Sequence, residues 1–253
     1  MKFQFVSDLH LEIADNSRYL KEYLPVTGEV LLIAGDSIYL GQEHLLKHPF
    51  WKWAADNYER VIAVPGNHEY YAFYDLASVP KSHRWELASN VHICSNTVEH
   101  IGDVDIVAST LWAHIDIKDA FLTELYVSDF YRIRYGENNL TAALFNKEHL
   151  SCVDFIKKSI KESCAATKIV LTHHVPSPLV TAEEFKNSSI NGAFVADLTE
   201  YIAQSDINYW IYGHSHRNVC KQIGNTQVLS NQLGYVSRQE FLHGFNPSAH
   251  ISV

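Results

Sequence analysis

Residues 61–69 read VIAVPGNHE, an apolar β-branched run that ends in a glycine, an amide, an imidazole and a carboxylate. The apolar part, 61–64, has the length and composition of a strand that is buried on both faces. Such a strand usually ends in a plain surface turn, and Gly66-Asn67 by itself is a common turn pair. His68 directly after Asn67 raises the question of whether this turn belongs to a functional site.

Four other apolar runs end in the same kinds of side chain. They cover 3–6, 30–34, 169–171 and 209–212, and further strand-like runs cover 91–94 and 104–108. The residues that follow the five runs are Asp8 and His10, Asp36, Asn67 and His68, His173 and His174, and His214 and His216. In open α/β sheets, sites form beyond the carboxyl ends of the strands, where the loops converge. The sequence therefore predicts one cleft in which these side chains surround a cation.

Helical spacing at about 43–58, 147–164 and 195–204 alternates with some of these runs. The alternation predicts an α/β fold with helices packed on sheets. Segments 98–108 and 219–229 are predicted to be hairpins, so the sheets should be mixed, with antiparallel strands toward their edges. Segment 112–146 should be helix plus irregular loop. Because no linker or repeat marks a boundary, we expect a single domain over 1–253.

Spacing within the motifs favours two metals. Asp8 and His10, like His214 and His216, are two residues apart, and such residues point to the same side of an extended segment. Each pair could therefore reach one metal, or two neighbouring metals about 3.5–4 Å apart. Glycine precedes three of the motifs, at Gly35, Gly66 and Gly213. A residue without a Cβ permits unusual backbone angles or close approach there.

The motifs in order are Asp8-Leu9-His10, Gly35-Asp36, Gly66-Asn67-His68-Glu69, a histidine after a strand, and Gly213-His214-Ser215-His216. This series, spread over residues 8–216, resembles the calcineurin-like metallophosphoesterase superfamily. The resemblance implies a four-layer sandwich, in which two mixed β-sheets are flanked by helices. It also implies a metal-dependent phosphoesterase, in which segment 112–146 is a variable insertion near the site.

The same resemblance assigns roles to individual residues. Asp8, His10 and His216 would hold one metal; Asn67, His173 and His214 would hold the other; Asp36 would bridge them together with a water or hydroxide. His68 would stay off the metals as general acid and, with Asn67, contact the substrate phosphate. His173 is preferred because it directly follows the strand, and His174 is the open alternative.

Imidazole, carboxylate and amide donors suit two divalent or trivalent ions among Mn, Fe, Zn and Ni, with manganese favoured. A hydroxide held by such metals would attack phosphorus directly. Glu69, the last residue of the third motif, is expected to orient the turn instead of binding metal. Trp112 is expected to pack in the core or at the rim of the site.

The second motif continues as Ser37-Ile38-Tyr39 and lacks the GDxxDRG pattern of the protein Ser/Thr phosphatases, so that substrate class is not carried over. We expect a small phosphorylated molecule or nucleotide. Twenty Lys and Arg against 29 Asp and Glu give a net charge of −9, which disfavours polymeric nucleic acid and anionic membranes. A phosphodiesterase or nuclease is the first alternative. A non-catalytic scaffold is the second, disfavoured because every motif residue is present.

The four cysteines form no CxxC pair, and the first residues, MKFQFVSDLH, contain no long apolar segment. No window approaches the ~18 uninterrupted apolar residues of a membrane helix. We therefore expect reduced thiols and a cytoplasmic protein without a membrane partner. The sequence leaves the oligomeric state open.

Overall fold

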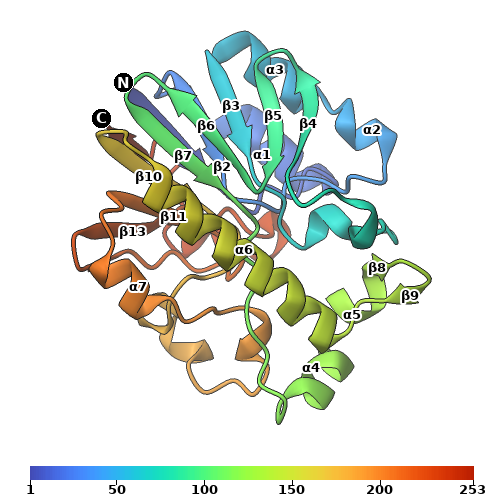
Figure 1. Cartoon of the computed structure of the whole chain (residues 1–253). Coiled ribbons are helices and arrows are strands. Elements are labelled where there is room, and N and C mark those ends of the chain that lie inside the picture. The colour runs from blue at the N-terminus through green and yellow to red at the C-terminus, as the bar shows by residue number, and fades with distance from the viewer.

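The computed structural model describes residues 1–253 and contains two six-stranded sheets (Figure 1). The first has the strand order β14-β1-β2-β3-β5-β4, and the second β12-β13-β11-β10-β7-β6. The first sheet consists of β1 (Lys2–Val6), β2 (Val30–Ile33), β3 (Arg60–Ala63), β4 (His83–Ala88), β5 (Val91–Ser95) and β14 (His250–Ser252). The second consists of β6 (Thr97–Ile101), β7 (Val104–Ala108), β10 (Thr167–Leu171), β11 (Tyr209–Tyr212), β12 (Lys221–Ile223) and β13 (Thr226–Ser230).

Both sheets are mixed, as predicted. The central strands run parallel, and the four edge strands, β14, β4, β12 and β6, pair antiparallel with their neighbours. The two predicted hairpins are β6-β7 and β12-β13. The five strands that precede the motifs, β1, β2, β3, β10 and β11, are therefore all among the parallel ones.

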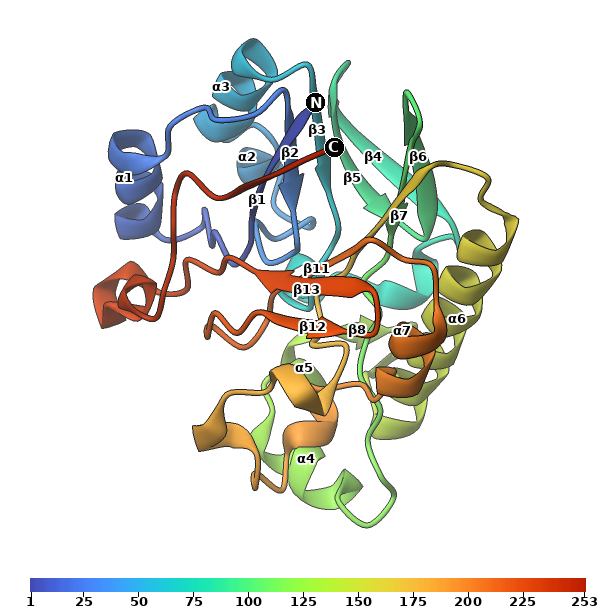
Figure 2. The same ribbon diagram turned by 90° about the vertical axis from the view of Figure 1, so that its left-hand side faces the viewer.

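The sheets pack face to face, with helices on both outer sides (Figure 2). Leu32 of β2 and Ile169 of β10 belong to the core between the sheets, whereas Leu31 and Ile33 point to the helices on the outer face. Burial on both faces explains why these strands are continuous apolar runs instead of alternating ones. The result is the four-layer sandwich that the resemblance implies.

Seven α-helices complete the layers. They are α1 (Ala14–Tyr23), α2 (Glu43–Leu46), α3 (Pro49–Asn57), α4 (Ala120–Tyr126), α5 (Asp129–Arg132), α6 (Ala142–Glu162) and α7 (Thr199–Gln204). Helices α1, α2 and α3 lie outside the first sheet, and α6 and α7 outside the second (Figure 2). Segment 112–146 contains α4, α5 and the two-residue strands β8 (Arg134–Tyr135) and β9 (Asn138–Asn139). None of the helices combines the length and apolar composition that crossing a membrane requires.

Helix boundaries were predicted less well than strands. The single helix expected at 43–58 is two helices, because Pro49 starts a new one and the His48 side chain accepts a bond from the Phe50 N–H. Helix α6 begins at Ala142 and not at 147, and Thr141 caps its N-terminus. Helix α7 is shorter than the predicted 195–204, because Val195 forms a parallel bridge with Val175. Helix α1 and strands β4 and β14 were not predicted.

Candidate metal centre

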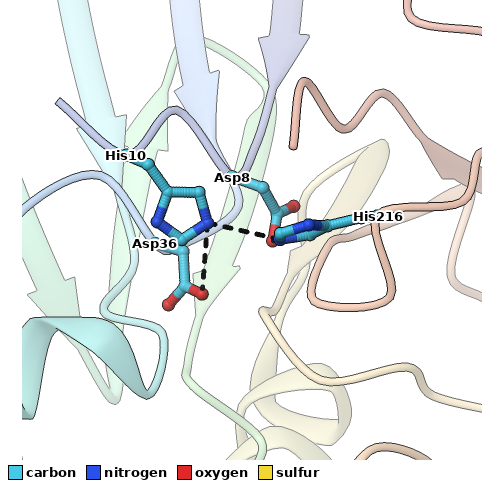
Figure 3. Close-up of side chains that lie close together, drawn as sticks. All are labelled: Asp8, His10, Asp36 and His216. Atoms are coloured by element: carbon cyan, nitrogen blue, oxygen red, sulfur yellow. Dashed lines mark hydrogen bonds and ion pairs between the residues drawn. The ribbon is translucent and has the colours of Figure 1, made fainter. Parts of the chain in front are cut away.

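The loops after β1, β2, β3, β10 and β11 meet at one place and bring the motif side chains together. Ligand-type atoms of Asp8, His10, Asp36 and His216 lie within 4.8 Å of one another. Figure 3 shows these four side chains pointing toward a common centre. A second group consists of Asp36, His173 and His214, and Asn67 Oδ1 lies 3.1 Å from His173 Nε2. Asp36 belongs to both groups and lies between them, as a bridging ligand would.

The backbone brings the pairs together in a way that the sequence did not predict. We expected extended segments at 8–10 and 214–216, but Asp8, His10, His214 and His216 have φ values of 55°, 45°, 79° and 50°, and Asp36 has 54°. These five are among only eleven non-glycine residues with positive φ. Left-handed backbone at a residue with a Cβ costs on the order of 1–3 kcal/mol, and such strain gathers at functional sites.

Two glycines are required by close approach. A Cβ on Gly66 would lie 2.2 Å from Asp36 Oδ1 and 2.7 Å from His173 Nε2. Gly35 has a φ of +88°, and a Cβ there would lie 2.3 Å from His173 Nδ1. Both positions therefore allow side chains from the two sheets to pack directly against the chain.

Each of the four histidines in the two groups directs one ring nitrogen to an oxygen outside them. The contacts are His10 Nδ1 with Glu12 Oε1 (3.1 Å), His216 Nδ1 with Glu240 Oε2 (2.6 Å), His173 Nδ1 with the Ala34 carbonyl (2.8 Å) and His214 Nε2 with the Ala193 carbonyl (3.4 Å). Because carboxylate and carbonyl oxygens only accept, these nitrogens carry the proton. Histidines that bind metals are oriented in the same way.

The other ring nitrogens face one another across very short gaps. His10 Nε2 is 3.2 Å from His216 Nε2, and His173 Nε2 is 3.0 Å from His214 Nδ1. Two lone pairs at this distance repel, so each pair needs either a shared proton or a cation. Imidazole nitrogens beside carboxylates are a donor set that transition metals bind well. The residues present therefore fit metal ions.

The buried carboxylates also draw positive charge into the site. Burial alone would lower the pKa of His216, but Asp8 and Glu240 outweigh it and raise this pKa to about 10. Asp36 outweighs burial in the same way and raises the pKa of His173 to about 9. A metal cation satisfies the same carboxylates in place of these protons.

His68 lies beside the two groups and outside both of them. Its ring stacks on Tyr71, with centroids 4.2 Å apart, and its Nε2 is 3.9 Å from Asp36 Oδ2. Burial would lower its pKa, but the Asp36 and Glu12 carboxylates outweigh burial and raise the pKa above the usual value. With His10 and Glu12 it forms a further group of possible ligand atoms. The imidazole also lines the adjacent cavity.

The neighbouring histidines in the fourth motif occupy different environments. His173 belongs to the second group, whereas His174 packs against the rings of Trp112 and Phe145, with centroids 5.2 and 5.8 Å away. Burial lowers the pKa of His174 well below its usual value. Trp112 itself is buried, in agreement with a packing role.

A family profile described as calcineurin-like phosphoesterase matches residues 1–218. The chain belongs to this family. A protein from Acanthamoeba polyphaga mimivirus, described as uncharacterized, is 29% identical over an alignment of 276 positions, which includes 99% of this chain and 96% of the viral protein. The crystal structure of phosphopantetheinyl hydrolase from Mycobacterium tuberculosis superposes with a TM-score of 0.68 at 12% identity, over 100% of this chain and 95% of the other. The protein is thus a metal-dependent phosphoesterase by family, and the structural likeness supports the fold.

Glu69 connects two of the phosphoesterase motifs. Its fully buried carboxylate accepts bonds from the backbone N–H groups of Asp36, Ser37, Ile38 and Gly66, and from the Ser37 hydroxyl. Three of those backbone donors belong to the loop after β2 and one to the loop after β3. Glu69 therefore fixes the two loops relative to each other, which agrees with the orienting role predicted for it.

Three acidic residues at this phosphoesterase site were not singled out in the sequence. Glu12 and Glu240 hold His10 and His216 as described above. The third is Asp129 in α5, whose Oδ1 accepts bonds from Asn67 Nδ2 (2.8 Å) and from the Tyr71 hydroxyl (2.6 Å). Only Glu12 carries a local signal, because it lies two residues after His10, where a side chain could reach back to the ring.

Proposed function

We propose that this phosphoesterase hydrolyses phosphate esters of small molecules at a centre of two metals. Asp8, His10 and His216 would hold one ion, Asn67, His173 and His214 the other, and Asp36 both. The observation that carries the proposal is the pair of short imidazole contacts on either side of Asp36, with every outward ring nitrogen already bonded to an acceptor. Manganese and a cytoplasmic location remain predictions from the sequence.

Asn67 and His68 would have different roles around the phosphate. When bound, two divalent cations supply positive charge for the phosphate oxygens and lower the pKa of a coordinated water. Asn67 presents its Oδ1 toward the second group, because its amide nitrogen is already donating to Asp129. His68, beside the groups and on the lining of the cavity, would donate a proton to the ester oxygen, a role that its raised pKa supports.

The size of the adjacent space supports a small substrate. A cavity of about 480 Å³ adjoins Asp36, Asn67, His68, His214 and His216. That volume falls within the usual range for sites that bind small molecules. The net charge of −9 argues against a nucleic acid polymer. The likeness to phosphopantetheinyl hydrolase is one of fold, at 12% identity, and carries no argument about the substrate of this chain.

The proposal is tested by a metal-supplemented screen that compares an aryl phosphate, its bis-aryl diester, and single-stranded DNA and RNA, with elemental analysis of the same sample. Monoester hydrolysis with two metals per chain is expected. Cleavage of polymers alone would favour the nuclease alternative. Two bound metals without hydrolysis of any ester would favour a scaffold.

His68 supplies the sharper test. His68→Ala should lower kcat by about 10²–10⁴ while the metal content stays at the wild-type level, because general acid catalysis contributes about that factor. His44→Ala, at an exposed histidine of α2, is the matched control and should change neither quantity. Loss of the metals with unchanged activity per remaining metal site would show that the role given to His68 is wrong.

A further inference from the structure

One wall of the cavity beside the candidate metal centre is apolar. Val127, between α4 and α5, contributes one part of it. The other apolar side chains of this wall are Phe185, Ile190, Phe194 and Val195 of segment 178–198, which also contributes the polar residues Thr181, Ser188 and Asn191 to the lining of the cavity. Both elements lie at the same end of the molecule, beyond the two sheets (Figures 1 and 2). A substrate held at the metals would therefore extend from a polar floor onto an apolar wall.

The wall is fixed to the loop that carries His173. Val175 forms a parallel bridge with Val195, its N–H donates to the Phe194 carbonyl (3.1 Å), and its carbonyl accepts from the Ala196 N–H (2.8 Å). Phe194 and Val195 are consequently held on a backbone that is paired with the fourth motif. Their side chains form a preformed surface, which binding does not need to order first.

The apolar wall is in contact with a candidate metal ligand. The ring of Phe194 stacks on the imidazole of His214, with centroids 4.8 Å apart and an angle of 22° between the planes. If the phosphorus of an ester lies beside His214, this ring would be the first apolar surface that the ester carbons meet. The wall is therefore placed to contact the leaving group of the ester.

We propose, on the basis of the proposed function, that the substrates are phosphate esters whose leaving group carries an apolar chain or ring, which packs on Val127, Phe185, Ile190, Phe194 and Val195. The wall acts as the specificity determinant of the phosphoesterase. A short polar alcohol such as glycerol would leave it uncovered. The gain from each methylene that packs on the wall should be about fourfold in kcat/KM, from the usual transfer free energy of a buried CH₂.

A series of n-alkyl phosphates, from ethyl to hexyl, isolates this effect. All members release a primary alkoxide, so the intrinsic difficulty of the chemical step is nearly constant and only the apolar length changes. Release of inorganic phosphate by the metal-loaded enzyme is the measurement. We expect kcat/KM to rise by about fourfold per methylene until the chain has covered the wall. Glycerol 1-phosphate, also a primary ester, should resemble the ethyl ester or fall below it.

Two variants assign the effect to the wall. Ile190→Thr shortens the side chain by one carbon and replaces apolar surface with a hydroxyl, and should reduce the ratio of hexyl to ethyl kcat/KM by threefold or more. Leu179→Ala is the matched control, an exposed apolar residue of the same segment that does not line the cavity, and should leave the ratio unchanged. A comparable loss in both variants would show that the segment acts through its folding and not through contact.

The outcomes separate this inference from the proposed function. If ethyl phosphate and the aryl phosphate are hydrolysed but the alkyl series is flat, the inference is wrong and the function stands. If protein with two bound metals hydrolyses neither the alkyl phosphates nor the aryl phosphate, the proposed function fails as well.

Discussion

Asp129 should control the orientation of the Asn67 amide. Its carboxylate is about 1% exposed, and Oδ1 accepts one bond from Asn67 Nδ2 at 2.8 Å and one from the Tyr71 hydroxyl at 2.6 Å. A carboxylate only accepts, so the NH₂ end of Asn67 must face it. The carbonyl end then faces His173 Nε2, at 3.1 Å, where a metal would need it.

The perturbation is Asp129→Ala, which removes the acceptor. The buried Tyr71 hydroxyl then loses its acceptor, and Asn67 Nδ2 keeps only its longer bond to that hydroxyl, at 3.3 Å. A buried donor without a partner costs about 1–3 kcal/mol, so we expect a loss of about 1–6 kcal/mol of unfolding free energy. The amide also loses the reason to keep its oxygen toward His173. Removing a residue that orients a metal ligand typically lowers metal affinity by about 10–100-fold, and we expect a loss of that size for the second ion.

The assay is calorimetric titration of metal-depleted protein with Mn²⁺, combined with elemental analysis and kcat on an aryl phosphate. Asp129→Asn keeps an acceptor oxygen and should recover most of the affinity. Phe130→Leu perturbs packing in the same helix without touching Asn67, and should lower the melting temperature while leaving Mn²⁺ affinity intact. A folded Asp129→Ala protein with wild-type Mn²⁺ affinity and kcat would refute the reasoning.

Two further predictions concern the loops that hold the site. Glu69→Gln should destabilise the protein by about 2–6 kcal/mol, because either orientation of the new amide leaves two backbone N–H groups without an acceptor. Each kcal/mol lowers the melting temperature by about 2–4 °C. A melting temperature within about 1 °C of wild type would contradict this prediction. Gly66→Ala should displace Asp36 and His173, since its Cβ would lie 2.2 and 2.7 Å from their ligand atoms, and should lower kcat/KM by about 10²-fold. Gly41→Ala is the control, because a Cβ there meets nothing closer than 3.5 Å, and equal losses in both variants would argue against the steric explanation.

The sheets and the convergence of the motifs could be predicted because both depend on local features and one general rule. Runs such as 30–34 and 61–64 are apolar at every position, which is typical of strands covered on both faces. Parallel strands place their carboxyl ends at the same edge, so the motif that follows each run must lie near the others. Neither inference requires knowledge of distant contacts.

Asp129 and Glu240 could not be predicted, because their roles depend on contacts between distant parts of the chain. Asp129 reaches Asn67 across 62 positions, and Glu240 reaches His216 from a short turn near the C-terminus. Nothing in the sequence around either residue distinguishes it from an ordinary surface carboxylate. Only the path of segment 112–146, which has no regular period, brings Asp129 under the site.

The left-handed backbone at the motifs could not be predicted for the same reason, because it also depends on contacts between distant parts of the chain. Each of the five strained residues has its N–H bonded by another part of the structure. The bonds are Asp8 to the Gly35 carbonyl, His10 to the Asp36 carbonyl, Asp36 to Glu69 Oε2, His214 to Asp8 Oδ1 and His216 to Gln232 Oε1. Most of these bonds join different loops, and the one from His214 to Asp8 joins the two sheets. The conformation that aims the side chains is therefore a property of the assembled sandwich, so a motif can identify the residues without specifying the backbone angles that they adopt.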